Sequence, residues 1–171
     1  MLSKVVQDAL NKQINNEFMA SYAYLAMAAH CERVHFTGAG KWLRIQSQEE
    51  YGHAMRLLNF LLARGGKVEL KALATPKGDY KSLFDVFDTA YKQEQSVSKA
   101  INGLYEIAFK EKAFDTVVQT EWFVNEQVEE EQTMRQIVAK LEMIKDDAPS
   151  LLDFDRELGS RVAGAQAPAA E

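Results

Sequence analysis

Residues 43–61, LRIQSQEEYGHAMRLLNFL, put a carboxylate and an imidazole in the middle of a helical face that is otherwise mostly apolar. At spacings of three and four residues, this face consists of Leu43, Ser47, Glu50, His53, Leu57 and Leu61. Apolar residues at this spacing are typical of a helix that packs into a core. The pair Glu50-x-x-His53 lies on one side of the helix and is therefore expected to point inward.

The helix breakers predict four long helices and a short fifth one. All three prolines and most of the glycines lie outside the long periodic segments. Ser82-x-x-Asp85 is a capping box that opens the third helix, and Ser150-x-x-Asp153 opens the short one. The long helices are expected over residues 4–33, 40–64, 83–110 and 113–145.

The lengths of the connections predict the topology. The segment from Gly65 to Lys81 can span about 55 Å when extended, more than the ~42 Å of a 28-residue helix, so helices two and three can be parallel. The other two turns are short and make antiparallel pairs. We expect one domain, an all-α four-helix bundle with one long crossover. The bundle takes residues 1–147, the fifth helix 148–161 and a flexible tail 162–171.

The composition limits the class of protein. With 171 residues, 47% of them hydrophobic, the chain can form one domain with a sizeable core. A net charge of −5 disfavours nucleic acid as a partner. Cys31 is the only cysteine, which excludes an internal disulfide framework and favours a cytoplasmic location. No uncharged stretch reaches the roughly 18 residues of a membrane span, and the N-terminus lacks signal-peptide features, so we expect no membrane association.

The other three long helices also carry polar residues near the middle of an apolar stripe. These residues are Glu17, Glu94, Gln127 and Glu130. Since residues at the midpoints of bundled helices arrive at about the same level, we expect them to converge with Glu50 and His53. The full inward stripe of the third helix is predicted to be Phe84, Phe87, Tyr91, Glu94, Ser98 and Ile101.

Four carboxylates in one layer of a core need a cation. A buried, unpaired charge is costly, whereas a whole domain is stable by only about 5–15 kcal/mol. Lysine and arginine are absent from the inward positions, which leaves bound metal as the simplest explanation. Carboxylates and one imidazole suit divalent iron or manganese, and zinc is also compatible. A lone Glu-x-x-His pair is more typical of a solvated face, so the prediction depends on all four carboxylates together.

The whole pattern resembles the ferritin family, and in particular the prokaryotic non-haem ferritins, over nearly the entire chain. The matching motifs are Glu17, Glu49-Glu50-x-x-His53, Glu94 in YKQEQ, and Asn125-Glu126-Gln127-x-x-Glu130. They occur in the family's order and at its spacing.

The resemblance implies a role for each of these residues. One iron of a ferroxidase centre would be held by Glu17, Glu50 and His53. The second would be held by Glu50, Glu94 and Glu130, so that Glu50 bridges the two. Gln127 would be a near neighbour of these two irons. The third iron position of the prokaryotic branch is matched by Glu49, Glu126 and Glu129, together with Glu130. Tyr24 and Trp122, by default core residues, match aromatic positions beside the centre, where the tyrosine is associated with electron donation.

The resemblance also implies a function. Fe(II) would be oxidised by O2 or H2O2 and stored as ferric mineral inside a homo-oligomer of 24 subunits. No haem is expected, because the haem-ligating methionine of bacterioferritins falls on Tyr51. The acidic pair lining the three-fold channels of animal ferritins falls on Val117 and Thr120, which leaves the iron entry route open. Two alternatives are a di-iron oxidase or peroxidase that stores no mineral, and a catalytically silent cage subunit.

The fifth helix is expected to take part in assembly. Its apolar residues are Leu151, Leu152, Phe154 and Leu158. A helix this short adds little to a finished bundle, so we expect its apolar side to meet neighbouring subunits.

Overall fold

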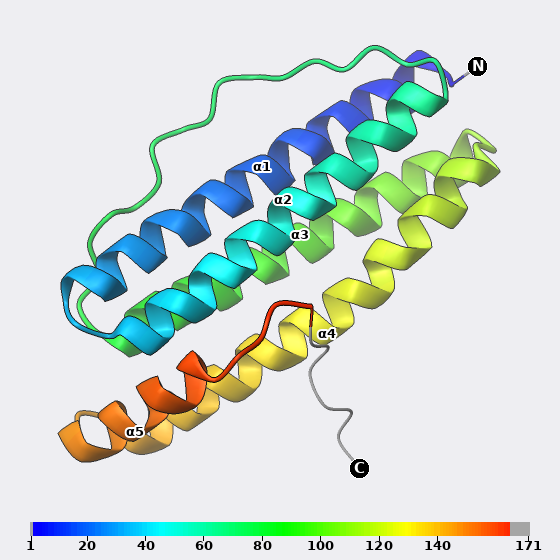
Figure 1. Ribbon diagram of the computed structural model, residues 1–171. Helices are drawn as coiled ribbons and strands as arrows, with labels where there is room; N and C mark the ends of the chain where they lie inside the picture. Colours follow the sequence, from blue (N-terminus) through cyan, green and yellow to red (C-terminus); the bar gives the residue numbers. More distant parts are fainter. Residues whose placement is uncertain (1, 165–171) are drawn as a thin grey trace.

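The computed structural model describes residues 2–164 and contains, within that range, five helices and no strand (Figure 1). The helices are α1 (Lys4–Arg33), α2 (Thr37–Ala63), α3 (Leu83–Lys110), α4 (Phe114–Ile144) and α5 (Ala148–Gly159). They confirm the expected all-α bundle with a short fifth helix. Among the described helices, none has a stretch long and apolar enough to cross a membrane. Residues 165–171 of the expected flexible tail lie outside the described residues.

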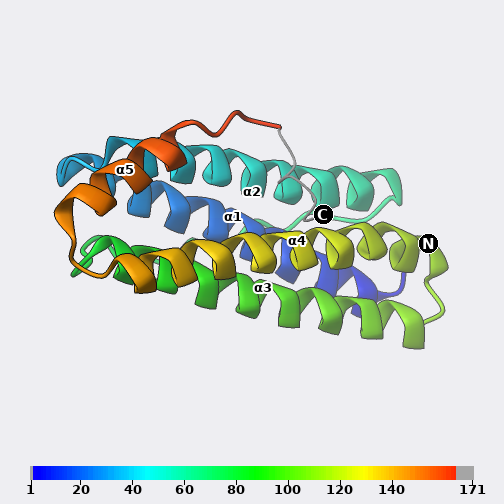
Figure 2. The same cartoon turned by 90° about the horizontal axis from the view of Figure 1, so that it is seen from below.

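The crossover between α2 and α3 runs the length of the bundle, as its reach predicted. Figure 1 shows this segment leaving α2 at one end of the molecule and entering α3 at the other, so that the two helices are parallel. Figure 2 shows the α1–α2 pair beside the α3–α4 pair, with α5 at one end. The connectivity therefore brings the midpoints of all four long helices to one level.

Two asparagines of α1 hold the crossover in place. Asn11 donates to the carbonyl of Lys67 (2.9 Å) and accepts from the amide of Glu69 (2.7 Å). Asn15 repeats the pattern one turn later with Glu69 and Lys71. These side chains satisfy backbone groups that an extended segment cannot pair within itself, so the long connection lies fixed against α1.

The apolar core is divided into two clusters, and the predicted carboxylates lie between them. In each long helix the carboxylate is flanked by one residue of each cluster. The flanking pairs are Ile14 and Tyr24 around Glu17, Leu57 and Leu43 around Glu50, Val97 and Ala90 around Glu94, and Phe123 and Met134 around Glu130. The polar residues thus form a layer at mid-height of the bundle.

The structure corrects three details of the expected helices. Phe84 does not point inward: it is 37% exposed, and Leu83 and Val86 are buried instead. The short helix begins at Ala148, as its expected bounds have it, but its N-cap is Asp147 and not Ser150: a carboxylate oxygen of Asp147 accepts from the amide of Ser150. Helix α2 begins at Thr37, three residues before the expected start, because its cap comes from another helix.

That cap is Asp155 of α5. Its two carboxylate oxygens accept from the amides of Gly38 (3.0 Å) and Ala39 (2.7 Å) at the start of α2. The preceding residue, Phe36, offers no side-chain cap. At Gly38 a Cβ would lie 1.8 Å from the carbonyl oxygen of Asp155, so only glycine allows α5 to come this close. Helix α5 is therefore docked on α2 through a buried carboxylate.

We predict that Asp155→Ala lowers the thermal unfolding temperature. Loss of an N-cap costs about 1–2 kcal/mol, which corresponds to roughly 2–8 °C for a chain of this size. Differential scanning calorimetry checks the shift. The control is Asp153→Ala, which removes an exposed carboxylate of α5 that forms an ion pair with Arg156 on the same helix. Equal shifts in the two variants would contradict the capping role.

Candidate metal centre

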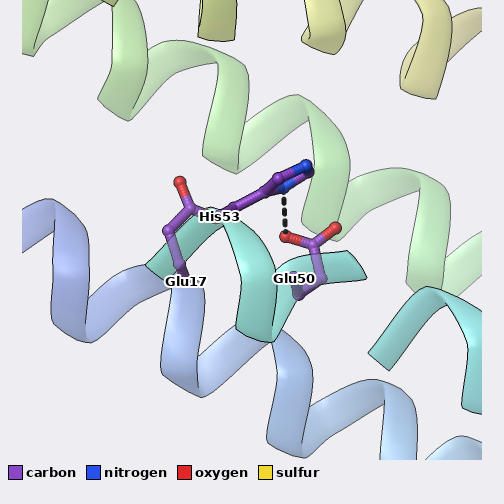
Figure 3. A group of neighbouring side chains, drawn as sticks. All are labelled: Glu17, Glu50 and His53. Atoms are coloured by element: carbon purple, nitrogen blue, oxygen red, sulfur yellow. Dashed lines mark hydrogen bonds and ion pairs between the residues drawn. The ribbon is translucent and has the colours of Figure 1, made fainter. Parts of the chain in front are cut away.

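Three of the predicted ligands form a buried cluster inside the bundle (Figure 3). Glu17 comes from α1, and Glu50 and His53 from α2. One potential ligand atom of each lies within 4.8 Å of the other two, so one ion can contact all three. The Nδ1 atom of His53 lies 3.3 Å from a carboxylate oxygen of Glu50. Within residues 2–164, this is the one group of three such side chains that meets at this distance.

Neutral amides orient the two carboxylates of the cluster. Gln13 donates to Glu17 (2.7 Å), and Gln46 donates to Glu50 (3.3 Å). Each glutamine lies four residues before its glutamate, on the same helical face. Sequence analysis did not assign these glutamines a role, although the repeated four-residue spacing was the available signal. Because both donors are neutral, they bring no positive charge to the cluster.

Glu94 lies in the same layer but in a separate hydrogen-bond network. The Tyr24 hydroxyl donates to one of its carboxylate oxygens. The side-chain amide of Gln127 donates to the other (3.1 Å). The structure thus places Tyr24 and Gln127 beside the predicted centre, while Glu94 remains outside the cluster of Glu17, Glu50 and His53.

Glu130 is also buried and also outside that cluster. Its Oε2 accepts from Gln46 (2.9 Å), the same amide that contacts Glu50. Gln46 is fully buried and connects the α2 and α4 carboxylates. With these hydrogen bonds in place, Glu94 and Glu130 are held by Tyr24 and by glutamine donors instead of converging on one point.

The carboxylates of the expected third position line a single groove, of about 870 Å³, without forming a compact cluster. They are Glu49, Glu126, Glu129 and Glu130. An oxygen of Glu126 lies 4.0 Å from Nε2 of His53, which also lines the groove, and Glu129 is exposed. Glu49 accepts from the guanidinium of Arg161 at 2.6 Å. Arg161 had no predicted role, and no local sequence signal points to it.

Trp122 packs against the cluster. Its ring lies 5.4 Å from the His53 ring and 4.8 Å from Phe123, edge to face in both cases. The Arg56 guanidinium lies over the same indole, 3.9 Å from the ring centroid. These contacts fix the position of the imidazole at the edge of the layer.

Burial raises the pKa values of the central carboxyl groups. The pKa of Glu17 rises to about 8, because of burial and the neighbouring charge of Glu50. The pKa of Glu130 rises to about 7, through burial and the charge of Glu94. Glu50 and Glu94 shift in the same direction, chiefly because both are buried. At neutral pH the metal-free layer therefore retains protons, as expected when no cation compensates the carboxylates.

The donor set fits a divalent transition metal. Carboxylate oxygens and one imidazole suit iron or manganese. Oε2 of Glu17 is buried and has no hydrogen-bond partner among residues 2–164, an arrangement that a bound ion would satisfy. A bound metal would also displace the protons that these carboxyl groups hold in the metal-free protein.

The fold and the site together define a helical-bundle protein with a buried, carboxylate-rich candidate metal site inside the bundle. The family model described as the Ferritin-like domain matches residues 7–144. The chain therefore belongs to the ferritin family.

Similar proteins span nearly the full length of the chain. The bacterial non-heme ferritin of Staphylococcus aureus (strain USA300) is 37% identical over 161 residues, which cover 94% of this chain and 97% of the relative. An open pore ferritin from the hyperthermophilic archaeon Archaeoglobus fulgidus is 40% identical, with a TM-score of 0.93 and coverage of 95% and 99%. A humanized archaeal ferritin is 38% identical, with a TM-score of 0.94 and coverage of 96% and 100%.

We predict that Glu17→Gln stabilises the metal-free protein at neutral pH. Because the folded-state pKa of about 8 lies above the unfolded value, the folded state binds this proton more tightly. Stability is therefore unaffected below about pH 4.5 and falls as the pH rises toward 8. At pH 7, which lies 2.5 units above the unfolded value of 4.5, the substitution should add on the order of 3 kcal/mol.

Thermal unfolding of chelator-treated protein between pH 5 and pH 8 checks this prediction. The unfolding temperature of Glu17→Gln should fall less with pH than that of the unsubstituted protein. Glu121→Gln, at an exposed position of α4, is the control and should leave the slope unchanged. An unchanged slope for Glu17→Gln would contradict the role assigned to this carboxyl group.

Proposed function

We propose that this protein is an iron-storage ferritin that oxidises Fe(II) at a di-iron ferroxidase centre inside the bundle. The observation that carries the proposal is the buried cluster of Glu17, Glu50 and His53, with Glu94 and Glu130 in the same layer. Membership in the ferritin family and the similarity to bacterial non-heme ferritin support iron storage.

The residues divide into two binding positions that share Glu50. Glu17, Glu50 and His53 would bind one ferrous ion. Glu94 and Glu130, with Glu50, would bind the second after releasing the hydrogen bonds they accept from Tyr24 and Gln46. Gln127 stays next to this second position through Glu94 and Ser98.

The reaction takes one electron from each ferrous ion. Two Fe(II) ions, O2 and two protons give two Fe(III) ions and H2O2; with H2O2 as the oxidant, two Fe(II) ions and two protons give two Fe(III) ions and two water molecules. The carboxyl groups of Glu17 and Glu130, with pKa values of about 8 and 7, release protons when ferrous ions bind. Because Tyr24 donates its hydrogen bond to Glu94, we assign it the role of positioning this carboxylate until the second ion binds.

We further propose that 24 subunits form a hollow shell that stores the ferric mineral, and that the protein is cytoplasmic. The expectation that the whole apolar side of α5 meets neighbouring subunits is wrong for Phe154 and Leu158, which are buried in the core of this chain. Leu152 is 54% exposed, and this exposed part of α5 supports assembly. Cys31, the one cysteine, is buried and free, which suits a reducing compartment. A di-iron oxidase without storage would instead be expected as a monomer or dimer, and a silent subunit would lack the ligand set.

We predict that Glu50→Ala abolishes rapid iron oxidation, because it removes the ligand shared by both ions. Glu129→Ala, in the outer groove, should leave the first oxidation phase intact and slow only later turnover. The measurement is the rise in ferric absorbance when protein loaded without oxygen with two ferrous ions per subunit is mixed with oxygenated buffer. Equal loss in both variants would contradict the assignment of roles.

We predict that a chain ending at Asp147, without α5, does not form the shell. Light scattering and size-exclusion chromatography check the mass of the assembly. A chain ending at Gly164 retains α5 and Arg161 and should assemble fully. A complete shell from the shorter chain would show that α5 is dispensable for assembly.

A further inference from the structure

Arg161 brings a positive charge from the C-terminal segment to the edge of the carboxylate layer. After α5 the chain continues along the bundle toward its middle (Figure 2). The side chain of Arg161 is only 18% exposed and donates to Gln46 (2.8 Å) and to Glu49 (2.6 Å). Its guanidinium also lies 4.2 Å from the ring of Trp42. Three contacts from one helix therefore fix this cation in one geometry.

The contact with Gln46 reaches the two proposed iron positions. Because Oε1 of Gln46 accepts from Arg161, its Nε2 is directed at the carboxylates of Glu50 and Glu130. A buried amide has one donor end and one acceptor end, so the cation on one side sets which end faces the carboxylates on the other. Arg161 thus orients a side chain that contacts both α2 and α4.

The contact with Glu49 neutralises one carboxylate of the groove. The groove is lined by four glutamates of α2 and α4, and by Glu157 of α5. The other cation in its lining, Lys140, is paired with Glu157 at 2.5 Å. Among the described lining residues, Arg161 is therefore the cation that faces the glutamates of α2 and α4.

We propose that Arg161 is a tethered counterion for the third metal position. It occupies Glu49 while this position is empty, and it must leave Glu49 when a divalent ion binds there. Arg161 therefore weakens the binding of a third ion relative to the two ions inside the bundle. The proposal rests on the proposed ferroxidase function. It adds that Arg161 regulates the affinity of the third metal position.

An anaerobic titration of the assembled, metal-free protein with Fe(II) tests the proposal. Isothermal titration calorimetry should resolve two tighter ions and one weaker ion per subunit in the unsubstituted protein. Removing a charge-assisted hydrogen bond that competes for the ligand should tighten the third ion by about tenfold in Arg161→Gln. The double variant Arg161→Gln with Glu49→Gln should show no such gain, because the ligand released by the first change is removed by the second.

The matched control is Arg156→Gln, which removes the same charge from an exposed position of α5. A third-ion affinity in Arg161→Gln within twofold of this control would overturn the proposal. Arg161→Lys keeps the charge but reaches only one of the two acceptors, and should give about a threefold gain. If light scattering shows that Arg161→Gln does not assemble, Arg161→Lys is used for the test instead.

The outcomes separate this inference from the proposed function. If the unsubstituted protein binds no ferrous ion tightly, the ferroxidase centre is contradicted, and the counterion role falls with it. If two ions bind tightly but neither Arg161 variant changes the third, only the counterion role is contradicted.

Discussion

The structure depends on one unfavourable arrangement: carboxylates from all four long helices are buried in a single layer of the core. Burial of an ionised carboxylate costs several kcal/mol unless a cation compensates it. Here the neighbouring donors of Glu17, Glu50, Glu94 and Glu130 are glutamines, a tyrosine and a histidine. The raised pKa values of these groups are the direct electrostatic consequence, and a divalent metal is the simplest ligand that would reverse them.

The rest of the fold supports this layer. Two apolar clusters above and below it provide the burial that stabilises the bundle, and the long crossover makes α2 and α3 parallel so that the four midpoints meet. Helix α5 is tied to α2 by Asp155 and continues into Arg161, which reaches the outer edge of the layer. The C-terminal segment thereby reaches the edge of the carboxylate layer through the contacts of Arg161 with Gln46 and Glu49.

Sequence periodicity predicted the long helices and the inward carboxylates, because a helix that carries one polar residue in an apolar stripe must bury it with the stripe. It failed at Phe84, where the stripe was assigned one residue away from Leu83, which is buried. It also missed the Asp155 cap and the Arg161 contacts. Both join residues more than 100 positions apart, and their geometry exists only after α5 has docked. Gln13 and Gln46 could be predicted in part. Their position four residues before Glu17 and Glu50 can be read from the sequence, but the direction of their side-chain amides cannot.

The most direct test of the account is anomalous diffraction at the iron edge from crystals loaded with Fe(II) in the absence of oxygen. We predict two ions at mid-height of each bundle, bridged by Glu50, with Glu17 and His53 on one side and Glu94 and Glu130 on the other. Iron found only at surface carboxylates, or a bundle interior without anomalous density, would contradict the claim that the buried carboxylate layer is a metal site.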